Sequence, residues 1–384
     1  MLMKRFVTAA AIAILAAACS KEEDVAPPAE LVEFDPTVSI DRVWSAGTKG
    51  GDEVLRLGLR PAVQGERAYV AGHGGDVHAV ELATGRDLWR VSTDLELSGG
   101  PAVGEGVVVV GSSGGELVAL DAETGGKRWQ VATGGEVLTA PTVAGGIVVV
   151  RTVDGRLRGL RVSDGTEAWN YEQPVPRLTL RGNGSPVVDG DMVIAGLDNG
   201  KVIALSLTTG ELLWSTTVAP SRGRTEIERL VDIDSPVRVM GDDIFVVGYQ
   251  GRLAMLARDT GQLWWGRDLS SNRGLAADSD NLYVTTADST VVALRRRDGT
   301  PVWTQDAMIR RSLTGPVLSG DTLVVGDFEG YLHWLDAATG QMLARGKTGG
   351  GRLSNAPVAT GDLLLMQTDS GEVQAWRAQP RGAG

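Results

Sequence analysis

Short runs of β-branched and apolar residues recur along most of the chain, and glycine-containing turns separate them. Val107–Val110, Ile147–Val150 and Ile244–Val247 are examples, and each run is typical of a buried strand. A second strand pattern, Gly-x-(Val or Leu)-x-x-Leu, follows the runs, as in Gly115–Leu120 and Gly200–Leu205. The polar and apolar positions therefore predict many short strands joined by tight turns.

A tryptophan ends each group of strands and returns about every 40 residues, which is the mark of an internal repeat. Its positions are Trp44, Trp89, Trp129, Trp169, Trp214, Trp265 and Trp303, and Ala344 takes the eighth place. From Trp89 onward a glycine stands four residues earlier, in turns such as Asp121–Gly125. Turn residues followed by a large apolar side chain predict a hairpin whose last strand is anchored by the tryptophan.

Each group of strands opens at a second marker, which is a proline in all groups but one. The positions are Pro61, Pro101, Pro141, Pro186, Pro236, Leu275, Pro316 and Pro357. The spacing from this marker to the tryptophan is almost constant, so each group has a fixed length. Four strands in about 40 residues are typical of a propeller blade. The sequence therefore predicts an all-β fold, an eight-bladed β-propeller of four-stranded blades.

The first and last repeats are incomplete in complementary ways. Trp44 lacks three preceding strands, whereas the group that opens at Pro357 reaches the end of the chain without a fourth strand. We expect an N-terminal strand to complete the last blade, which closes the ring and removes its open edges. The expected boundaries are residues 43–377 for the propeller and 378–384 for a short tail.

The N-terminal region predicts export. Lys4 and Arg5 precede the apolar run Phe6–Ala18. This run is too short to span a bilayer as a mature helix and is typical of a signal peptide, here residues 1–18. Residues 19–42 are polar, acidic and proline-containing, and we expect them to form a flexible tether.

The segment Leu15–Cys19 resembles a bacterial lipobox, although Ala16 stands where leucine is usual. Cys19 is the single cysteine of the chain, so it has no disulfide partner within it. We expect Cys19 to be lipidated, and ordinary signal cleavage after Ala18 is the alternative. Ser20 follows the cysteine, and by resemblance to lipoproteins of Gram-negative bacteria this implies sorting to the outer membrane.

Composition narrows the classes of function. The hydrophobic share of 42% is sufficient for a large core, and 52 glycines agree with a turn-rich β fold. The formal net charge of −11 provides no general basic surface for nucleic acid. We expect no nucleic-acid partner.

Candidate catalytic residues are few. The histidines are His73, His78 and His333, and the last two fall within predicted third strands of blades, where a packed side chain is expected. No Gly-x-Ser-x-Gly or His-Glu-x-x-His motif occurs. Trp264, Trp334 and Trp376 could stack on sugars, but they lie in or beside blade strands, where packing is the simpler explanation.

The glycine and tryptophan repeat resembles that of quinoprotein dehydrogenases. An enzyme of that class needs calcium ligands that converge on a quinone, and it commonly carries adjacent cysteines. Here most acidic residues lie on the repeated turns, where a solvated carboxylate is the expected state. We therefore expect no catalytic residue, no cofactor and no metal site, and a quinone-dependent or sugar-active periplasmic enzyme is the alternative.

Two consecutive links between blades are longer than most others and carry the strongest functional signal, because binding residues concentrate on long loops. The first contains Leu178, Leu180 and Arg181, and the second contains Asp232 and Asp234. Apolar anchors beside charges of both signs are typical of a protein interface. The alternative is that the apolar side chains, including Ile233, cover the core while the charges pair with one another.

Four segments together resemble the BamB family, the lipoprotein subunits of the bacterial machinery that assembles outer-membrane β-barrels. They are Leu178–Gly182 (LTLRG), Thr225–Leu230 (TEIERL), Asp232-x-Asp234 and Val325–Trp334 (VGDFEGYLHW). The resemblance covers the whole chain, and the first two segments are its most specific parts. The lipobox and the missing eighth tryptophan depart from the family pattern.

The resemblance implies a non-enzymatic scaffold, anchored by lipid to the outer membrane on its periplasmic face. Its implied partner is the periplasmic POTRA region of BamA, with nascent outer-membrane proteins as a second candidate. In that family the residues matching Leu178, Leu180, Arg181, Asp232 and Asp234 take part in binding BamA. We expect the chain to be a monomer within the complex.

Overall fold

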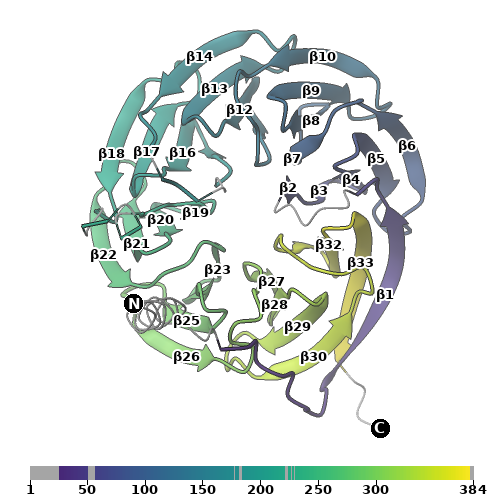
Figure 1. The fold of residues 1–384 in the computed structure, drawn as a ribbon, viewed down its shortest axis with the longest axis vertical. Coiled ribbons are helices and arrows are strands. Elements are labelled where there is room, and N and C mark those ends of the chain that lie inside the picture. Colours follow the sequence, from purple (N-terminus) through teal and green to yellow (C-terminus); the bar gives the residue numbers. More distant parts are fainter. Residues whose placement is uncertain are drawn as a thin grey trace, which may run out of the picture.

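The strands of the protein form a ring of eight sheets (Figure 1). The computed structural model describes residues 26–50, 57–176, 178–180, 184–220, 224–225, 227–228 and 230–380. Every regular element of these residues is a β-strand. The predicted all-β, eight-bladed propeller is confirmed.

Each blade is a four-stranded antiparallel sheet, and in all but the last blade the strands follow chain order from the centre of the ring to its rim. In the last blade the outermost strand comes from the N-terminal end of the chain. Blades 1 to 4 consist of β3 (Ala62–Gln64), β4 (Arg67–Ala71), β5 (Asp76–Glu81) and β6 (Asp87–Ser92); β7 (Leu97–Gly104), β8 (Val107–Ser112), β9 (Glu116–Asp121) and β10 (Lys127–Ala132); β11 (Thr142–Ala144), β12 (Ile147–Arg151), β13 (Arg156–Arg161) and β14 (Glu167–Glu172); and β15 (Val187–Asp189), β16 (Met192–Gly196), β17 (Lys201–Ser206) and β18 (Leu212–Thr217). The short strand β2 (Gly58–Leu59) adds to blade 2 by pairing parallel to β7.

The remaining four blades repeat this arrangement. Blades 5 to 8 consist of β19 (Arg238–Met240), β20 (Asp243–Val247), β21 (Arg252–Ala257) and β22 (Leu263–Asp268); β23 (Leu275–Ala277), β24 (Asn281–Thr285), β25 (Val291–Arg295) and β26 (Pro301–Gln305); β27 (Val317–Ser319), β28 (Thr322–Gly326), β29 (Tyr331–Asp336) and β30 (Met342–Lys347); and β31 (Val358–Thr360), β32 (Leu363–Gln367), β33 (Glu372–Pro380) and β1 (Val38–Gly47).

The N-terminal strand closes the ring, as the sequence predicts. β1 pairs antiparallel with β33, in a register that runs from Val38 opposite Pro380 to Gly47 opposite Glu372. The paired region is longer than expected, because β1 begins before residue 43 and β33 continues past residue 377. The extra residues satisfy the backbone hydrogen bonds of a strand edge that would otherwise face solvent.

The core lies between blades. One cluster joins Val107 and Val109 of blade 2 to Val148 and Val150 of blade 3. Each blade has a neighbouring blade packed against both of its faces. The second strands are therefore buried on both sides, and they are apolar at successive positions rather than at alternate ones. This explains why the β-branched runs are the clearest strand signal in the sequence.

The glycine and tryptophan of the repeat pack against each other across neighbouring blades. The indole of Trp169 in blade 3 donates a hydrogen bond of 2.7 Å to the carbonyl of Leu207, at the turn between the third and fourth strands of blade 4. Gly210 of that turn has a φ of 71°, and a Cβ there would lie 2.7 Å from the Trp169 ring. The turn glycines at 85, 125, 165, 261, 299 and 340 likewise approach the tryptophan of the preceding blade.

This packing explains why Ala344 replaces the eighth tryptophan. A tryptophan at this place in blade 7 would pack on the turn between the third and fourth strands of blade 8. No such turn exists, because β33 and β1 come from opposite ends of the chain. Trp376 and Trp334 share the apolar cluster around Ala344, with Val38 and Ile40 of the N-terminal region packed against it.

Residues 26–37, expected to belong to a flexible tether, lie along the outside of blade 7 (Figure 1). The backbone N–H of Ala29 donates 3.0 Å to Ile309, and that of Thr37 donates 3.0 Å to Leu343. The segment is therefore packed on the propeller. The predicted signal peptide and Cys19 lie outside the described residues. Among the described residues, no helix is long and apolar enough to cross a membrane.

Candidate functional site

The two faces of the ring are built from different connections. On one face, here the link face, the links between blades contact the hairpins that join second to third strands. Arg310 of one link, for example, donates its backbone N–H to Asp288 at 2.7 Å. On the opposite face, here the turn face, the two other kinds of hairpin meet, as where the N–H of Arg296 donates to Asp280 at 2.8 Å.

The two long links, residues 173–186 and 218–237, meet on the link face over blades 4 and 5. Val231 of the second link forms a parallel bridge with Asn199 of blade 4, and Asp232 forms an antiparallel bridge with Tyr249 of blade 5. Ile233, the next residue along the chain, is fully buried in the core between these blades. For Ile233 the alternative interpretation of the sequence, coverage of the core, describes its position, and the second link is fixed at this point.

One carboxylate joins the two long links. The side chain of Asp232 is buried, and it accepts a hydrogen bond from the backbone N–H of Leu180. A buried carboxylate that accepts a backbone N–H is a strong contact, because the acceptor is charged. Asp232 therefore holds the first link in place, and it is not itself exposed to a partner.

Three carboxylates gather around one arginine below the links. Arg151, at the end of β12, is buried and forms an ion pair with the buried Asp198. It also donates 2.7 Å to the carbonyl of Gly196. Pro174 and Pro176 of the first link line the same small cavity as Arg151 and Asp198, so the link covers this pair.

We call Asp198, Asp232, Asp234 and Arg151 the acid cluster, in which three carboxyl groups face one guanidinium. Burial raises the pKa of Asp232 to about 6, although the N–H of Leu180 opposes the shift. Burial, together with Asp232 and Asp198, raises the pKa of Asp234 to about 8. Within the described part of the chain, neither carboxylate oxygen of Asp234 has a hydrogen-bond partner. Asp234 therefore takes up a proton more readily than an exposed aspartate does.

These shifts predict that the folded protein loses stability as the pH rises. Asp232 and Asp234 hold protons more tightly in the folded chain than in the unfolded chain, whose ordinary pKa is 3.8. Their ionisation therefore penalises the folded state as the pH increases from about 4 to about 8. Thermal melts should show a falling midpoint over this range, and Asp234→Asn should flatten the slope. Equal slopes for the variant and the unchanged protein would contradict the assignment.

Two apolar side chains on the long links face solvent. Leu178 is 39% exposed and Ile227 is 69% exposed. Ile227 lies in a turn stabilised by reciprocal bonds, because the N–H of Glu228 donates 3.2 Å to the Thr225 hydroxyl while the Thr225 N–H donates 3.1 Å to the Glu228 carboxylate. This reciprocal pair has the hydrogen-bond pattern of a capping box, here in a turn rather than at the start of a helix, and it stabilises the turn that carries the exposed isoleucine.

The structure thus separates the predicted site residues into two groups. Leu178 is exposed and Leu180 is partly buried, whereas Asp232 is buried beneath them. Arg181 lies outside the described residues. Sequence reasoning missed Arg151 and Asp198, which carry no motif, and it missed Ile227, whose exposure could have been anticipated from an apolar residue between two glutamates.

The other candidates of the sequence are distributed elsewhere. His78 and His333 are fully buried in β5 and β29, third strands as predicted, and each contacts an aspartate. Trp334 and Trp376 are packed, but Trp264 is 56% exposed on β22, so the packing prediction is wrong for that residue.

A central cavity of about 550 Å³ is the site that an enzyme would use. Pro101 of β7 lines it, together with Pro61, Pro141 and Pro236, which lie just before innermost strands. Arg60 is the one titratable side chain among its described lining residues. Throughout the described chain, no three histidine, cysteine, aspartate or glutamate side chains are grouped so as to hold a metal ion.

Comparison with known proteins identifies similar chains. A family model described as "Outer membrane protein assembly factor BamB" matches residues 25–94, 73–305 and 287–379. A relative of that name in Pseudomonas aeruginosa is 46% identical over 368 residues, which cover 96% of this chain and 97% of the relative. Another in Escherichia coli K12 is 34% identical over 364 residues, 92% of this chain and 93% of the relative.

Solved structures show the same fold. The crystal structure of BamB from Moraxella catarrhalis superimposes with a TM-score of 0.82 at 29% identity, covering 88% of this chain and all of that one. The quinohemoprotein alcohol dehydrogenase of Comamonas testosteroni superimposes with a TM-score of 0.69 at 15% identity, covering 88% of this chain and 76% of that one. The second likeness is one of fold alone.

Proposed function

The chain belongs to the BamB family of outer membrane protein assembly factors, and from this we propose that it is a non-enzymatic scaffold of the β-barrel assembly machinery. Its partner in this proposal is the POTRA region of BamA, bound through the link face. The observation that carries the proposal is the similarity to assembly factors over nearly the whole chain, the two long links included.

The geometry supports a division of labour among the site residues. Leu178 and Ile227, which are exposed, provide apolar contact with the partner. Arg181, three residues after Leu178, provides a charged contact. Asp232 acts as a positioning residue, because its carboxylate holds Leu180 and so sets the course of the first link. Apolar anchors with a charged neighbour are the usual composition of an interaction hot spot.

Lipidation of Cys19 is the second part of the proposal. It would retain the protein at the periplasmic face of the outer membrane, next to the machinery. Nascent outer-membrane proteins are a further candidate partner, and the protein would act as a monomer within the complex. The similarity to assembly factors over nearly the whole chain supports a scaffold better than a quinone-dependent or sugar-active enzyme, because the likeness to a quinohemoprotein dehydrogenase is one of fold alone.

Charge reversal at Arg181 should abolish co-purification of BamA with the tagged protein. Loss of one member of a desolvated charged contact costs about 2–5 kcal/mol of binding free energy. Replacing Leu178 and Leu180 together with alanine should weaken binding by about 1–3 kcal/mol for each anchor. The measurement is a pull-down from solubilised outer membranes, with a thermal melt of each variant.

Arg296→Glu is the matched control, because Arg296 lies on the turn face between β25 and β26. It should leave both co-purification and the melt unchanged. Normal binding by the Arg181 variant would remove the links as the binding site. Lost binding with a collapsed melt would show instead that these residues serve the core.

A further inference from the structure

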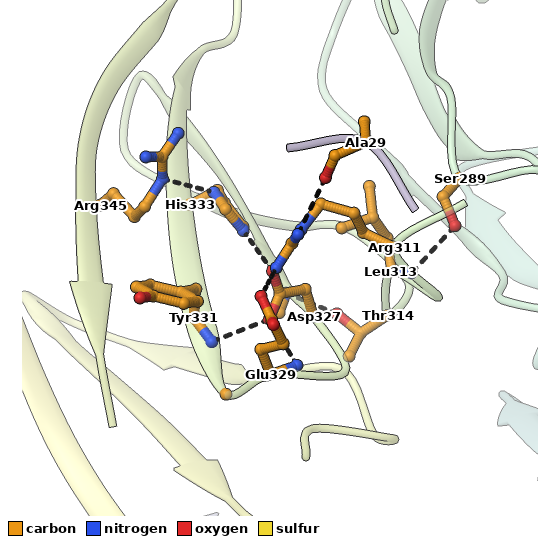
Figure 2. Close-up of polar contacts among 12 residues, drawn as sticks. Ala29, Ser289, Arg311, Leu313, Thr314, Asp327, Glu329, Tyr331, His333 and Arg345 are labelled. Atoms are coloured by element: carbon orange, nitrogen blue, oxygen red, sulfur yellow. Dashed lines mark hydrogen bonds and ion pairs between the residues drawn. The ribbon is translucent and has the colours of Figure 1, made fainter. Parts of the chain in front are cut away.

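A buried polar cluster binds the N-terminal segment to blade 7, and we call residues 26–37 the strap. Arg311 lies at the centre of the cluster and is buried. Its Nε donates 2.8 Å to Asp327, Nη2 pairs with Glu329, and Nη1 donates 3.0 Å to the carbonyl of Ala29 in the strap (Figure 2). The strap thus supplies one of the acceptors that a buried guanidinium requires.

A neutral histidine connects this arginine to a second one. Burial lowers the pKa of His333, so its ring is neutral at neutral pH. Its Nε2 lies 3.1 Å from Asp327, and its Nδ1 accepts from the Nε of Arg345 at 3.4 Å (Figure 2). Arg345 in turn donates 3.1 Å to the carbonyl of Val32 and lies 5.1 Å from the centre of the Phe34 ring.

Strap and cluster depend on each other for hydrogen bonds. Arg311 and Arg345 balance the charges of Asp327 and Glu329, while the carbonyls of the strap satisfy donors that the cluster leaves open. Arg311 is buried, and a buried donor that loses its acceptor destabilises the protein, so release of the strap is unfavourable. The strap is therefore a fixed part of the propeller.

The strap begins on the link face and ends near the turn face. At its start, Arg310 donates 2.8 Å to the carbonyl of Pro27, and the backbone of Arg310 bonds to Asp288 of a link-face hairpin. At its end, Thr37 bonds to Leu343, close to the turn that precedes β30. The described part of the strap therefore begins at the link face, between blades 6 and 7.

We propose that the strap fixes the orientation of the propeller on the bilayer, so that the edge of the link face at blades 6 and 7 is its membrane-proximal edge. The inference rests on lipidation of Cys19, as proposed above. Seven peptide units join Cys19 to Ala26, and a chain of this length spans at most about 25 Å. Released from the propeller, the chain from Cys19 to Val38 could span about 65 Å and would impose no orientation.

Fluorescence transfer to a lipid surface tests this orientation. The lipidated full-length protein is placed in vesicles of phosphatidylethanolamine and phosphatidylglycerol that carry an acceptor dye in the headgroup region. Because lipid occupies Cys19, a second cysteine is the single free thiol for the donor dye. Three sites are compared, Ala287→Cys on the link face of blade 6, Arg297→Cys on the turn face of the same blade, and Ser113→Cys on the link face across the ring.

The label at position 287 should show the highest transfer efficiency. Positions 287 and 297 are separated by the length of β25, about 16 Å for five residues at roughly 3.3 Å each. Replacing residues 27–36 with an equal number of glycines and serines should make the three efficiencies converge. The milder Arg310→Ala, which removes the contact to Pro27, should reduce the difference without risk to the blades, because Arg310 is exposed.

Three results would overturn the inference. The first is a transfer efficiency for the label at 297 or 113 that equals the efficiency for the label at 287. The second is a folded strap variant whose three transfer efficiencies equal those of the unchanged strap. The third is a mass spectrum that shows unmodified Cys19. Cys19→Ala provides the baseline, because it should not associate with the vesicles. BamA is absent from the assay, so failure of its binding to the long links does not affect the outcome.

Discussion

Replacing Gly210 with alanine is expected to lower the free energy of unfolding by about 2–4 kcal/mol, from two separate causes. Its φ of 71° is unfavourable for a residue with a Cβ, at a cost of about 1 kcal/mol. The added methyl group would also lie 2.7 Å from the Trp169 ring, and overpacking of this kind costs about 1–3 kcal/mol. Urea denaturation measures the change.

Gly241→Ala separates the two causes. Gly241 has a φ of 62° on a turn-face hairpin of blade 5, but a Cβ there would meet nothing within 4 Å. Only the backbone cost of about 1 kcal/mol should remain. Equal losses for the two variants would show that tryptophan packing is not the reason for glycine at position 210.

Replacing Arg151 with methionine is expected to destabilise the protein by about 3–5 kcal/mol, because removal of one partner leaves a buried charge uncompensated. Asp198 would lose its ion pair, and Asp232 and Asp234 would lose the nearby positive charge. The melting temperature should fall, and binding of BamA should weaken because the first link rests on this pair.

Arg86→Met is the control for this variant. Arg86 pairs with Glu81 at 3.1 Å, but its side chain is 64% exposed, so its loss should cost no more than about 1 kcal/mol. Asp198→Asn in the Arg151→Met background should restore part of the lost stability, because it removes the unpaired charge. A melt of Arg151→Met equal to that of the unchanged protein would exclude a structural role for the pair.

The sequence predicts the blades because their determinants are local and repeated. Glycine, tryptophan and proline recur at a fixed spacing. This single repeat length predicts the number of strands in a blade, the number of blades and the closure of the ring. The contact between Gly210 and Trp169 does not follow, because it joins two successive repeats. The alanine at position 344 becomes intelligible only when the structure shows that blade 8 lacks the turn on which a tryptophan would pack.

The candidate site is less predictable because its parts are chosen by contacts distant in sequence. The sequence around Asp232 predicts an exposed charge on a loop. In the structure Asp232 is buried, and it accepts a hydrogen bond from the backbone N–H of Leu180, 52 residues away. Arg151 ends an apolar strand and carries no motif, although it is the counter-charge of the cluster. The strap has the composition of a solvated tether, and the arginines that retain it lie more than 280 residues further along the chain.

The pairing of β1 with β33 has a consequence for biogenesis. Ser39 and Gln379, which bond across this pair, are 340 residues apart. If the chain is exported from its N-terminus, as its predicted signal peptide implies, β1 reaches the periplasm first and its partner last. During this interval β1 has an unpaired edge, which is a template for association with other chains. Contacts between such distant residues also form slowly, so we expect closure of the ring to be a late step of folding.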